Sequence, residues 1–236
     1  MYQVRAAEDR GQTRLAWLDS RHSFSFGDYF DPRHLGVSAL RVINDDTVTP
    51  GAGFGSHGHR DMEILTYVID GTIAHEDSTG NREQVPAGEF QLMHAGSGIY
   101  HSEFNASRND TLKFLQIWIL PDVLGGAPGY EQKRFERVAG LQLVASPDGA
   151  EGSLTVRQNV RIHRGVLAAG DTLALPLAPG RIGYLHMVRG RLSVSGGHAL
   201  AAGDGLAIRD EAQPQVSAGE HSEFLFFDLP PVTERN

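Results

Sequence analysis

Turn-forming residues interrupt this chain at short, regular intervals along its whole length. Its 236 residues include 28 glycines and 11 prolines, and short segments rich in β-branched and aromatic residues lie between them. The first clear segment, residues 62–69 (MEILTYVI), ends at Asp70-Gly71, a dipeptide that favours a two-residue hairpin turn. Closely spaced short strands are typical of β-sandwiches and barrels. The pattern therefore predicts an all-β protein with few, short helices.

Strands are predicted on both sides of a Gly- and Pro-rich connection at residues 122–150. In the first half they cover residues 62–69, 72–76, 82–85, 90–94, 99–104 and 112–120, with a break at 95–98. In the second half, from about residue 153, they cover residues 174–177, 182–188, 191–195, 206–209 and 223–229. Within the connection, residues 130–138 are expected to form a short helix. The segment 112–120 (LKFLQIWIL) is apolar on both faces, which predicts a strand covered by a layer on each side.

The second half weakly repeats the first. LTYVIDGTI (65–73) matches YLHMVRGRL (184–192), and VPAGEFQLM (85–93) matches LAAGDGLAI (200–208), in the same order. Repeats in a conserved order indicate duplication of one β-unit. We therefore expect two tandem β-barrels, one formed by residues 1–135 and the other by residues 136–236.

Composition excludes several classes of site and location. The chain has no cysteine, so disulfides, thiolate nucleophiles, iron–sulfur clusters and cysteine zinc sites are excluded. A formal net charge of -8 disfavours direct nucleic-acid binding. No apolar run approaches the length of a membrane-spanning helix, and the N-terminus lacks the apolar core of a signal peptide. A cytoplasmic, monomeric protein without membrane contact is expected.

Two pairs of potential metal ligands stand out, His57-Gly58-His59 and His101-Ser102-Glu103. Residues two apart on a strand project from the same face, so each pair can point both side chains into one barrel. Three imidazoles and a carboxylate suit a divalent first-row metal: iron, nickel, copper, cobalt, manganese or zinc. One such pair could arise by chance among eleven histidines, but two pairs joined by hairpins favour a site.

The other histidines have no such partner, and each is expected to be solvated or hydrogen-bonded in a structural role. They are His22, His34, His75, His94, His163, His186, His198 and His221.

Long, ordered motifs give the chain a family resemblance. FSFGDYFDPRHLGVSALRVINDD (24–46), GFGSHGHRDMEILTYVIDG (53–71) and QVPAGEFQLMHAGSGIYHSEFN (84–105) resemble the bacterial pirin family of the cupin superfamily, and more narrowly its quercetin 2,3-dioxygenases. The similarity continues through YEQKRF, DGLAIRDE and LFFDLPP, so it covers nearly the whole chain.

The resemblance implies a bicupin, two jelly-roll-like barrels with one metal, iron being expected, in the N-terminal barrel. Its ligands would be His57, His59, His101 and Glu103. The implied activity opens the central ring of a flavonol such as quercetin with dioxygen and releases carbon monoxide. Glu103 would also serve as the general base for the flavonol 3-hydroxyl.

Two alternatives to a flavonol dioxygenase stay open at this point. Eukaryotic pirins are nuclear, bind iron and have transcriptional regulators as partners. By this resemblance the chain could be a metal-loaded interaction module whose binding responds to the redox state of iron. A cupin that binds an unrelated small acid or sugar is the third possibility, because one fold hosts many functions. Turnover of oxygen and flavonol separates an enzyme from the other two.

Further residues are expected around the site. Candidates for an apolar slot that takes the flat flavonol are Phe26, Phe54, Phe90, Met93 and Ile117, for each of which a plain core position is the alternative. Asp61 and Glu63 could orient an imidazole from behind, with a surface role as the alternative.

The C-terminal barrel is expected to carry no metal, although HSEF recurs at residues 221–224. The positions that align with the ligands are Pro176, Ala178 and Val216, and none of these side chains can bind a metal. His221 falls after the aligned position.

Overall fold

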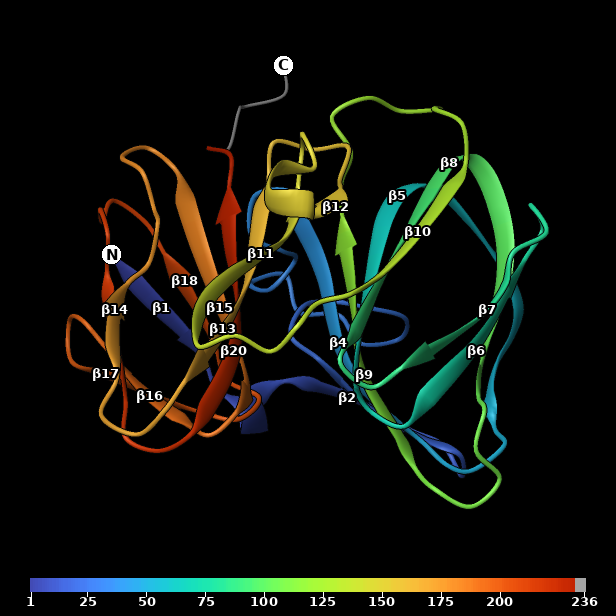
Figure 1. Ribbon diagram of the computed structural model, residues 1–236, viewed down its shortest axis with the longest axis horizontal. Helices are drawn as coiled ribbons and strands as arrows, with labels where there is room; N and C mark the ends of the chain where they lie inside the picture. The colour runs from blue at the N-terminus through green and yellow to red at the C-terminus, as the bar shows by residue number, and fades with distance from the viewer. Residues whose placement is uncertain (232–236) are drawn as a thin grey trace.

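The computed structural model describes residues 1–231 and shows two β-barrels side by side (Figure 1). The first barrel, which carries the two ligand pairs, is built from β2 Gly11–Arg14, β3 Leu18–His22, β4 Leu40–Val48, β5 Gly53–Asp70, β6 Thr72–Asp77, β7 Arg82–Pro86, β8 Glu89–Asn105, β9 Leu112–Ile119 and β10 Gly129–Arg134. These strands form one sheet in the order β2-β3-β4-β9-β5-β8-β6-β7, with β10 paired to β8.

The second barrel is built from two sheets. Its strands are β1 Tyr2–Arg5, β11 Gly140–Ser146, β12 Leu154–Thr155, β13 Arg161–Leu167, β14 Thr172–Ala174, β15 Ile182–Arg189, β16 Arg191–Val194, β17 His198–Ala201, β18 Gly205–Ile208, β19 Gln215–Ala218 and β20 Ser222–Leu229. The sheet orders are β1-β18-β15-β20-β13-β11-β12 and β14-β19-β16-β17. The predicted all-β fold of two tandem barrels is confirmed, and the helices of the described residues are two short 3₁₀ turns, Ala7–Asp9 and Ala150–Gly152.

The first strand of the chain pairs with the second barrel. β1 lies antiparallel to β18, and in Figure 1 the dark blue strand lies among the orange and red strands of the C-terminal half. The chain then crosses to the first barrel at β2. This crossing ties the N-terminus to residues more than two hundred positions away, such as Arg209, whose carbonyl accepts a bond from the Met1 ammonium group.

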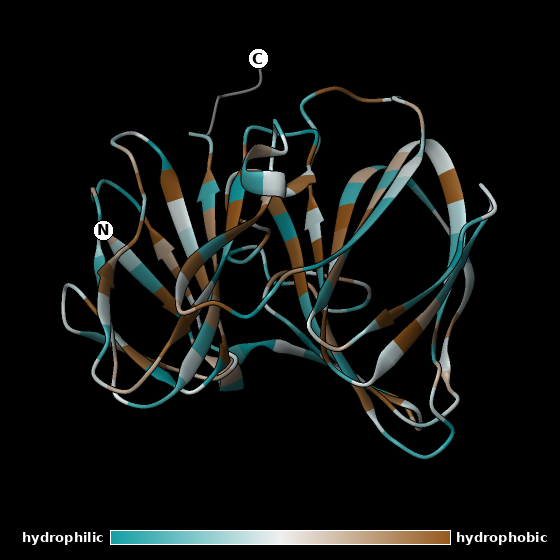
Figure 2. Ribbon diagram, viewed as in Figure 1, coloured by the Kyte–Doolittle hydropathy of each residue, from teal (hydrophilic) through white to brown (hydrophobic). Residues whose placement is uncertain are grey.

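The barrels pack against each other through the outer faces of their sheets. Alternation along β9 places Leu115, Ile117 and Ile119 in the core shared by the two barrels, while Phe114 faces the interior of the first barrel. The prediction that residues 112–120 form a strand covered on both faces is thereby confirmed. Figure 2 shows apolar stretches, in brown, that recur along the strands of both barrels. Burial of this shared face holds the two barrels in one unit.

The sequence repeat is reproduced in the strand pairing. Tyr67 and His186 occupy the same place in the first repeat, and Phe90 and Gly205 the same place in the second. In the structure Tyr67 pairs with Phe90 and His186 pairs with Gly205, so aligned positions form equivalent cross-strand pairs. This correspondence supports duplication of one β-unit.

Several predicted boundaries are wrong. The Gly-rich run at residues 95–98 does not end a strand but lies inside β8, which runs unbroken from Glu89 to Asn105. Residues 130–138 form no helix. The first part of this segment belongs to β10, which pairs antiparallel with β8, because strand pairing outweighs local helix propensity here. The strand predicted at 174–177 is β14, which ends at Ala174. Within residues 1–231, the structure has no helix long and apolar enough to cross a membrane.

Candidate metal centre

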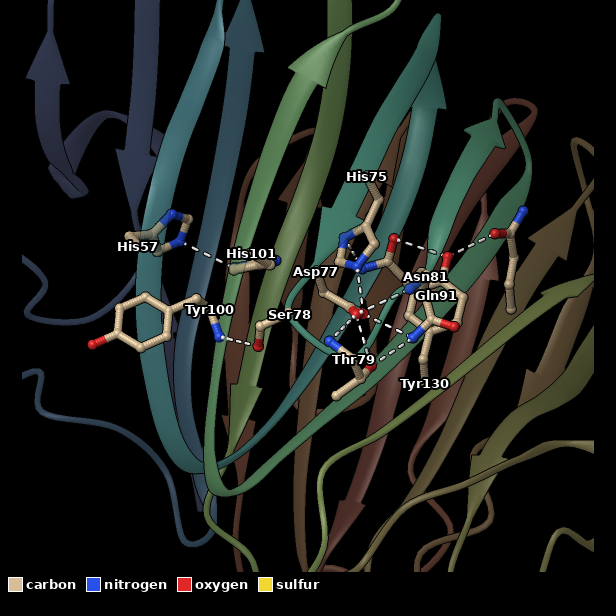
Figure 3. Close-up of polar contacts among 11 residues, drawn as sticks. His57, His75, Asp77, Ser78, Thr79, Asn81, Gln91, Tyr100, His101 and Tyr130 are labelled. Carbon is tan, nitrogen blue, oxygen red and sulfur yellow. Dashed lines mark hydrogen bonds and ion pairs between the residues drawn. The ribbon is translucent and has the colours of Figure 1, made fainter.

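The two predicted ligand pairs face each other inside the first barrel. His57 on β5 is the cross-strand partner of His101 on β8, and their Nε2 atoms lie 3.0 Å apart (Figure 3). His59 completes the group, with its ring centroid 4.8 Å from that of His57 and 4.9 Å from that of His101. The ligating atoms of the three imidazoles all lie within 4.8 Å of one another.

A hydrogen bond to the backbone fixes the tautomer of His57. His57 Nδ1 donates to the carbonyl of Gly55 at 2.8 Å, which leaves a lone pair on Nε2. Two nitrogens that bind one metal at about 2.1 Å and at a right angle lie about 3.0 Å apart, which is the separation of the His57 and His101 nitrogens. The distance between the two nitrogens therefore suits two ligands of one ion, and it is also the length of a hydrogen bond.

Glu103 is almost completely buried, at 2% exposed, and its carboxylate forms a group with His101 and His75 whose ligating atoms lie within 4.8 Å of one another. Its Oε2 accepts a hydrogen bond from Gln116 Nε2 at 2.7 Å. Its Oε1 has no partner, and the same holds for the buried His59 Nε2 and His101 Nδ1. Buried polar atoms without partners are rare in native proteins. A cation bound to the Nε2 atoms of the imidazoles would satisfy His59 Nε2 and Glu103 Oε1, so these residues fit a metal ion. His101 Nδ1 stays without a partner, because the two nitrogens of one imidazole ring point away from each other.

Burial controls the charges of the group. It lowers the pKa of His59 to about 4, with a further contribution from His57. It lowers the pKa of His101 to about 2, with further contributions from His57 and His59. Both rings are therefore neutral at physiological pH, the form in which imidazole binds metals. Burial also raises the pKa of Glu103 to about 7, and the Asp46 carboxyl adds to that rise.

A cavity of about 470 Å³ opens beside His57, His59 and Glu103. This is an ordinary size for a small-molecule site. Its lining is Thr13, Trp17, Leu18, Ser20, His22, Phe26, Gly27, Asp28, Asn44, Asp46, Gly53, Phe54, Gly55, His57, His59, Glu103, Gln116 and Trp118. The predicted aromatic residues Phe26 and Phe54 are thus confirmed as lining.

The other three predicted lining residues are core. Phe90 and Ile117 belong to the core between the barrels, and Met93 packs in a separate cluster with Ile64. Each lies on a strand of the first barrel, but its side chain is absent from the cavity wall. Trp17 and Trp118 also line the cavity, and neither was predicted to do so from the sequence.

Asp61 and Glu63 make no hydrogen bond to the imidazoles of His57, His59 or His101. The Asp61 carboxylate accepts from the Gly125 backbone N–H at 2.7 Å. Glu63 Oε2 accepts from His94 Nδ1 at 2.7 Å and from the Arg157 backbone N–H at 2.9 Å. The prediction that they orient a ligand imidazole is therefore wrong: both hold connecting segments in place.

A buried pair of residues, His75 and Asp77, lies next to His101. This pair was not predicted from the sequence to border the site. The ring of His75 on β6 is 5.4 Å from that of His101, and its Nε2 is 3.1 Å from Asp77 Oδ2 (Figure 3). A second group with ligating atoms within 4.8 Å of one another is His75, His101 and Glu103. His75 and Asp77 are also two residues apart on a strand, so the spacing rule used for the other pairs could have found them.

His22 meets the expectation of a hydrogen-bonded histidine, whereas His186 does not. His22 is hydrogen-bonded, to Thr13 at 2.8 Å and Asn44 at 2.7 Å, but it also lines the cavity. His186 is buried, and neither ring nitrogen has a partner, so its predicted solvated or hydrogen-bonded role is wrong. Burial lowers the pKa of His186 to about 3.

In the second barrel, the positions aligned with the ligands hold Pro176 and Ala178, both exposed, and Val216, which is buried in the core of that barrel. His221 is exposed in the turn between β19 and β20. Among the residues that the structure describes, the groups able to hold a metal lie in the first barrel.

Comparison with known proteins gives the family. Residues 3–119 match the family model described as Pirin, and residues 143–229 match the one described as Quercetinase C-terminal cupin domain. The quercetin 2,3-dioxygenase of Escherichia coli K12 is 50% identical over 232 residues, which is 98% of this chain and 100% of the relative. A pirin-like protein of Caulobacter vibrioides is 42% identical over 217 residues, 90% of this chain and 92% of the relative.

A solved structure agrees with these relatives. The crystal structure of the bacterial pirin YhhW from Escherichia coli in complex with nickel(II) is 50% identical, covers 98% of this chain and 100% of its own, and has a TM-score of 0.95. Identity and fold agree over both barrels, so this chain belongs to the pirin family of bicupins.

Proposed function

We propose that His57, His59, His101 and Glu103 bind one divalent transition metal and that the first barrel cleaves flavonols such as quercetin with dioxygen, releasing carbon monoxide. The observation that carries this proposal is the group of three imidazoles whose ligating atoms lie within 4.8 Å of one another, with the buried Glu103 carboxylate within the same distance of His101. His57, His59 and Glu103 also line an aromatic cavity. It is supported by the names of the relatives, of which one is a quercetin 2,3-dioxygenase and another a nickel(II) complex. Residues 136–236 are proposed to carry no metal.

The donor set does not select one metal by itself. Neutral imidazole suits iron, nickel, copper, cobalt and zinc, and a carboxylate adds manganese. Iron remains the expectation from the sequence, and the related pirin binds nickel(II). A metal held there would act as a Lewis acid that lowers the pKa of a coordinated hydroxyl.

The cavity walls suit a flat, partly apolar substrate. The lining includes the aromatic residues Phe26, Phe54 and Trp118 and the polar residues Ser20 and Asn44. Aromatic walls exclude water and hold a planar ring system in one orientation. Polar groups at fixed positions can bind the phenolic hydroxyls of a flavonol.

Glu103 is proposed to take the proton of the flavonol 3-hydroxyl. Its Oε1 carries no hydrogen bond, whereas Oε2 is bonded to Gln116. The deprotonated flavonol is electron-rich enough to react with dioxygen. The central ring loses one carbon as carbon monoxide and gains both oxygen atoms of dioxygen, so no external reductant is needed, and the proton on Glu103 returns to the product.

The test is anaerobic reconstitution of metal-free protein with each candidate metal in turn, followed by exposure to quercetin and oxygen. We expect at least one metal form to consume flavonol and oxygen in equal amounts and to release carbon monoxide, while the metal-free protein does not. If every metal form leaves quercetin intact and the iron form binds a protein partner according to its redox state, the regulatory alternative replaces this proposal. Intact quercetin without partner binding also overturns it.

A further inference from the structure

Gln116 on β9 joins the candidate ligand Glu103 to the cavity wall. The side chain is buried, at 7% exposed, and faces the interior of the first barrel. Its Nε2 donates to Glu103 Oε2 at 2.7 Å, and its Oε1 accepts from the indole Nε1–H of Trp118 at 3.2 Å. An indole nitrogen can only donate, so the amide oxygen has to face Trp118 and the amino group has to face Glu103. The orientation of the amide is therefore determined.

We infer that Gln116 is a positioning residue that presents Glu103 to the metal through one oxygen only. This inference rests on the proposed metal centre. Oε2 is occupied by the Gln116 amide, and Oε1 has no hydrogen bond and is left free for a metal. The Glu103 carboxylate lies within 4.8 Å of a ligating nitrogen of His101. Within residues 1–231, Gln116 is the one residue whose side chain donates a hydrogen bond to the Glu103 carboxylate. Without it, the carboxylate could rotate or bind through both oxygens.

The same bond suits the second task proposed for Glu103. A carboxylate that leaves a metal to carry a proton needs a tether if it is to return to its place. Gln116 holds Oε2 whether Oε1 carries a metal or a proton. Because the amide is neutral, it orients the carboxylate without the large loss of basicity that a neighbouring arginine or lysine would impose. A neutral donor therefore serves both the ligand and the base.

Trp118 extends the connection to the substrate side. Its indole meets the His59 ring edge to face at 4.9 Å and the Phe26 ring at 5.3 Å, and all three side chains line the cavity. The residue that orients the Gln116 amide is thus itself part of the wall. A change at Trp118 is expected to reach Glu103 through the amide.

The test uses the full-length protein loaded with cobalt(II), whose visible spectrum reports the ligand geometry without any flavonol. Gln116→Met keeps the length of the side chain but removes the donor, and Trp118→Phe keeps a ring but removes the Nε1–H. Thr66→Val is the matched control, since Thr66 pairs with Gln116 across the β5–β9 ladder and its hydroxyl has no partner. Affinity is measured by competition with a chelator.

Gln116→Met is expected to alter the cobalt spectrum and to weaken metal affinity roughly 10- to 100-fold, as removal of a residue that orients a ligand typically does. Trp118→Phe should shift both readouts in the same direction by less, and it tests the inference even if Gln116→Met does not fold. Thr66→Val should match the parent. Parental spectra and affinities in both Gln116→Met and Trp118→Phe would overturn the inference.

Flavonol turnover separates this inference from the proposed activity. If the parent does not cleave quercetin but the two variants change the cobalt spectrum, the dioxygenase proposal fails and the positioning role stands. If the parent cleaves quercetin and Gln116→Met keeps both its spectrum and its turnover per bound metal, the positioning role fails and the activity stands.

Discussion

His57 and His101 are direct cross-strand partners in a short stretch of the β5–β8 ladder whose register differs by one residue from the ladder on either side. The register shifts between Phe54 and His57 and again between His59 and Asp61. Such bulges re-aim side chains and increase local twist. Asp61, at the second shift, has a positive φ of 65°, as a bulge residue can. The two shifts set the ligand-bearing stretch apart from the regular sheet.

Removal of one imidazole should abolish tight metal binding. His57→Ala and His101→Ala each take away a ligand and leave the 3.0 Å nitrogen pair incomplete. We expect the metal content of both purified variants to fall to a small fraction of that of the parent, as measured by elemental analysis. His163→Ala, in the second barrel, is the control and should keep its metal. Parental metal content in both ligand variants would refute the assignment.

Replacement of Glu103 should separate metal binding from turnover. Glu103→Gln retains three imidazoles and still offers an amide oxygen, so some metal should remain bound. Activity per bound metal should drop roughly 10²- to 10⁴-fold, the usual effect of losing a general base. The measurement is flavonol loss divided by metal content, with carbon monoxide detected as the product. Equal losses of metal and activity would show that Glu103 is a ligand only.

Metal stoichiometry should be close to one per chain. The second barrel places Val216 and Ala178 where ligands would have to stand, and His221 is exposed in a turn. We therefore expect His221→Ala to keep the full metal content of the parent in elemental analysis. A ratio near two that falls by one equivalent in His221→Ala would contradict the absence of a site in residues 136–236.

His186 should make the fold sensitive to acid. Burial lowers its pKa to about 3 in the folded state, against 6.5 for an unperturbed histidine, so the unfolded chain binds more protons between these two values. The contribution of His186 to the free energy of unfolding is therefore fully present above pH 6.5. It falls by ~1.4 kcal/mol for each pH unit as the pH drops from 6.5 towards 3. The buried ring has no hydrogen bond to lose.

The test compares His186→Leu with the parent by chemical denaturation at pH 7 and pH 5. The free energy of unfolding of the parent should fall more between the two pH values than that of His186→Leu. His221→Ala, a change at an exposed histidine, is the control and should behave as the parent does. An identical pH dependence in His186→Leu and the parent would contradict the prediction.

The class of fold, the duplication and the four candidate ligands can all be read from the amino-acid sequence alone. These depend on local regularities. Side chains two apart on a strand share a face, which is why spacing alone was enough to pair His57 with His59 and His101 with Glu103. The hairpin at Asp70-Gly71 and the match of residues 65–73 to 184–192 are likewise properties of contiguous sequence.

Which strands are neighbours, and therefore which residues surround the site, depends on how the whole chain folds. Gln116 reaches Glu103 because β9 pairs with β5, which in turn pairs with β8, and no local pattern encodes that order. Phe90 and Ile117 alternate as a cavity residue would, but the face they share is the one covered by the second barrel. The register shifts that set off His57 and His59 arise from the pairing of two strands, so they too lie beyond what spacing along one strand can specify.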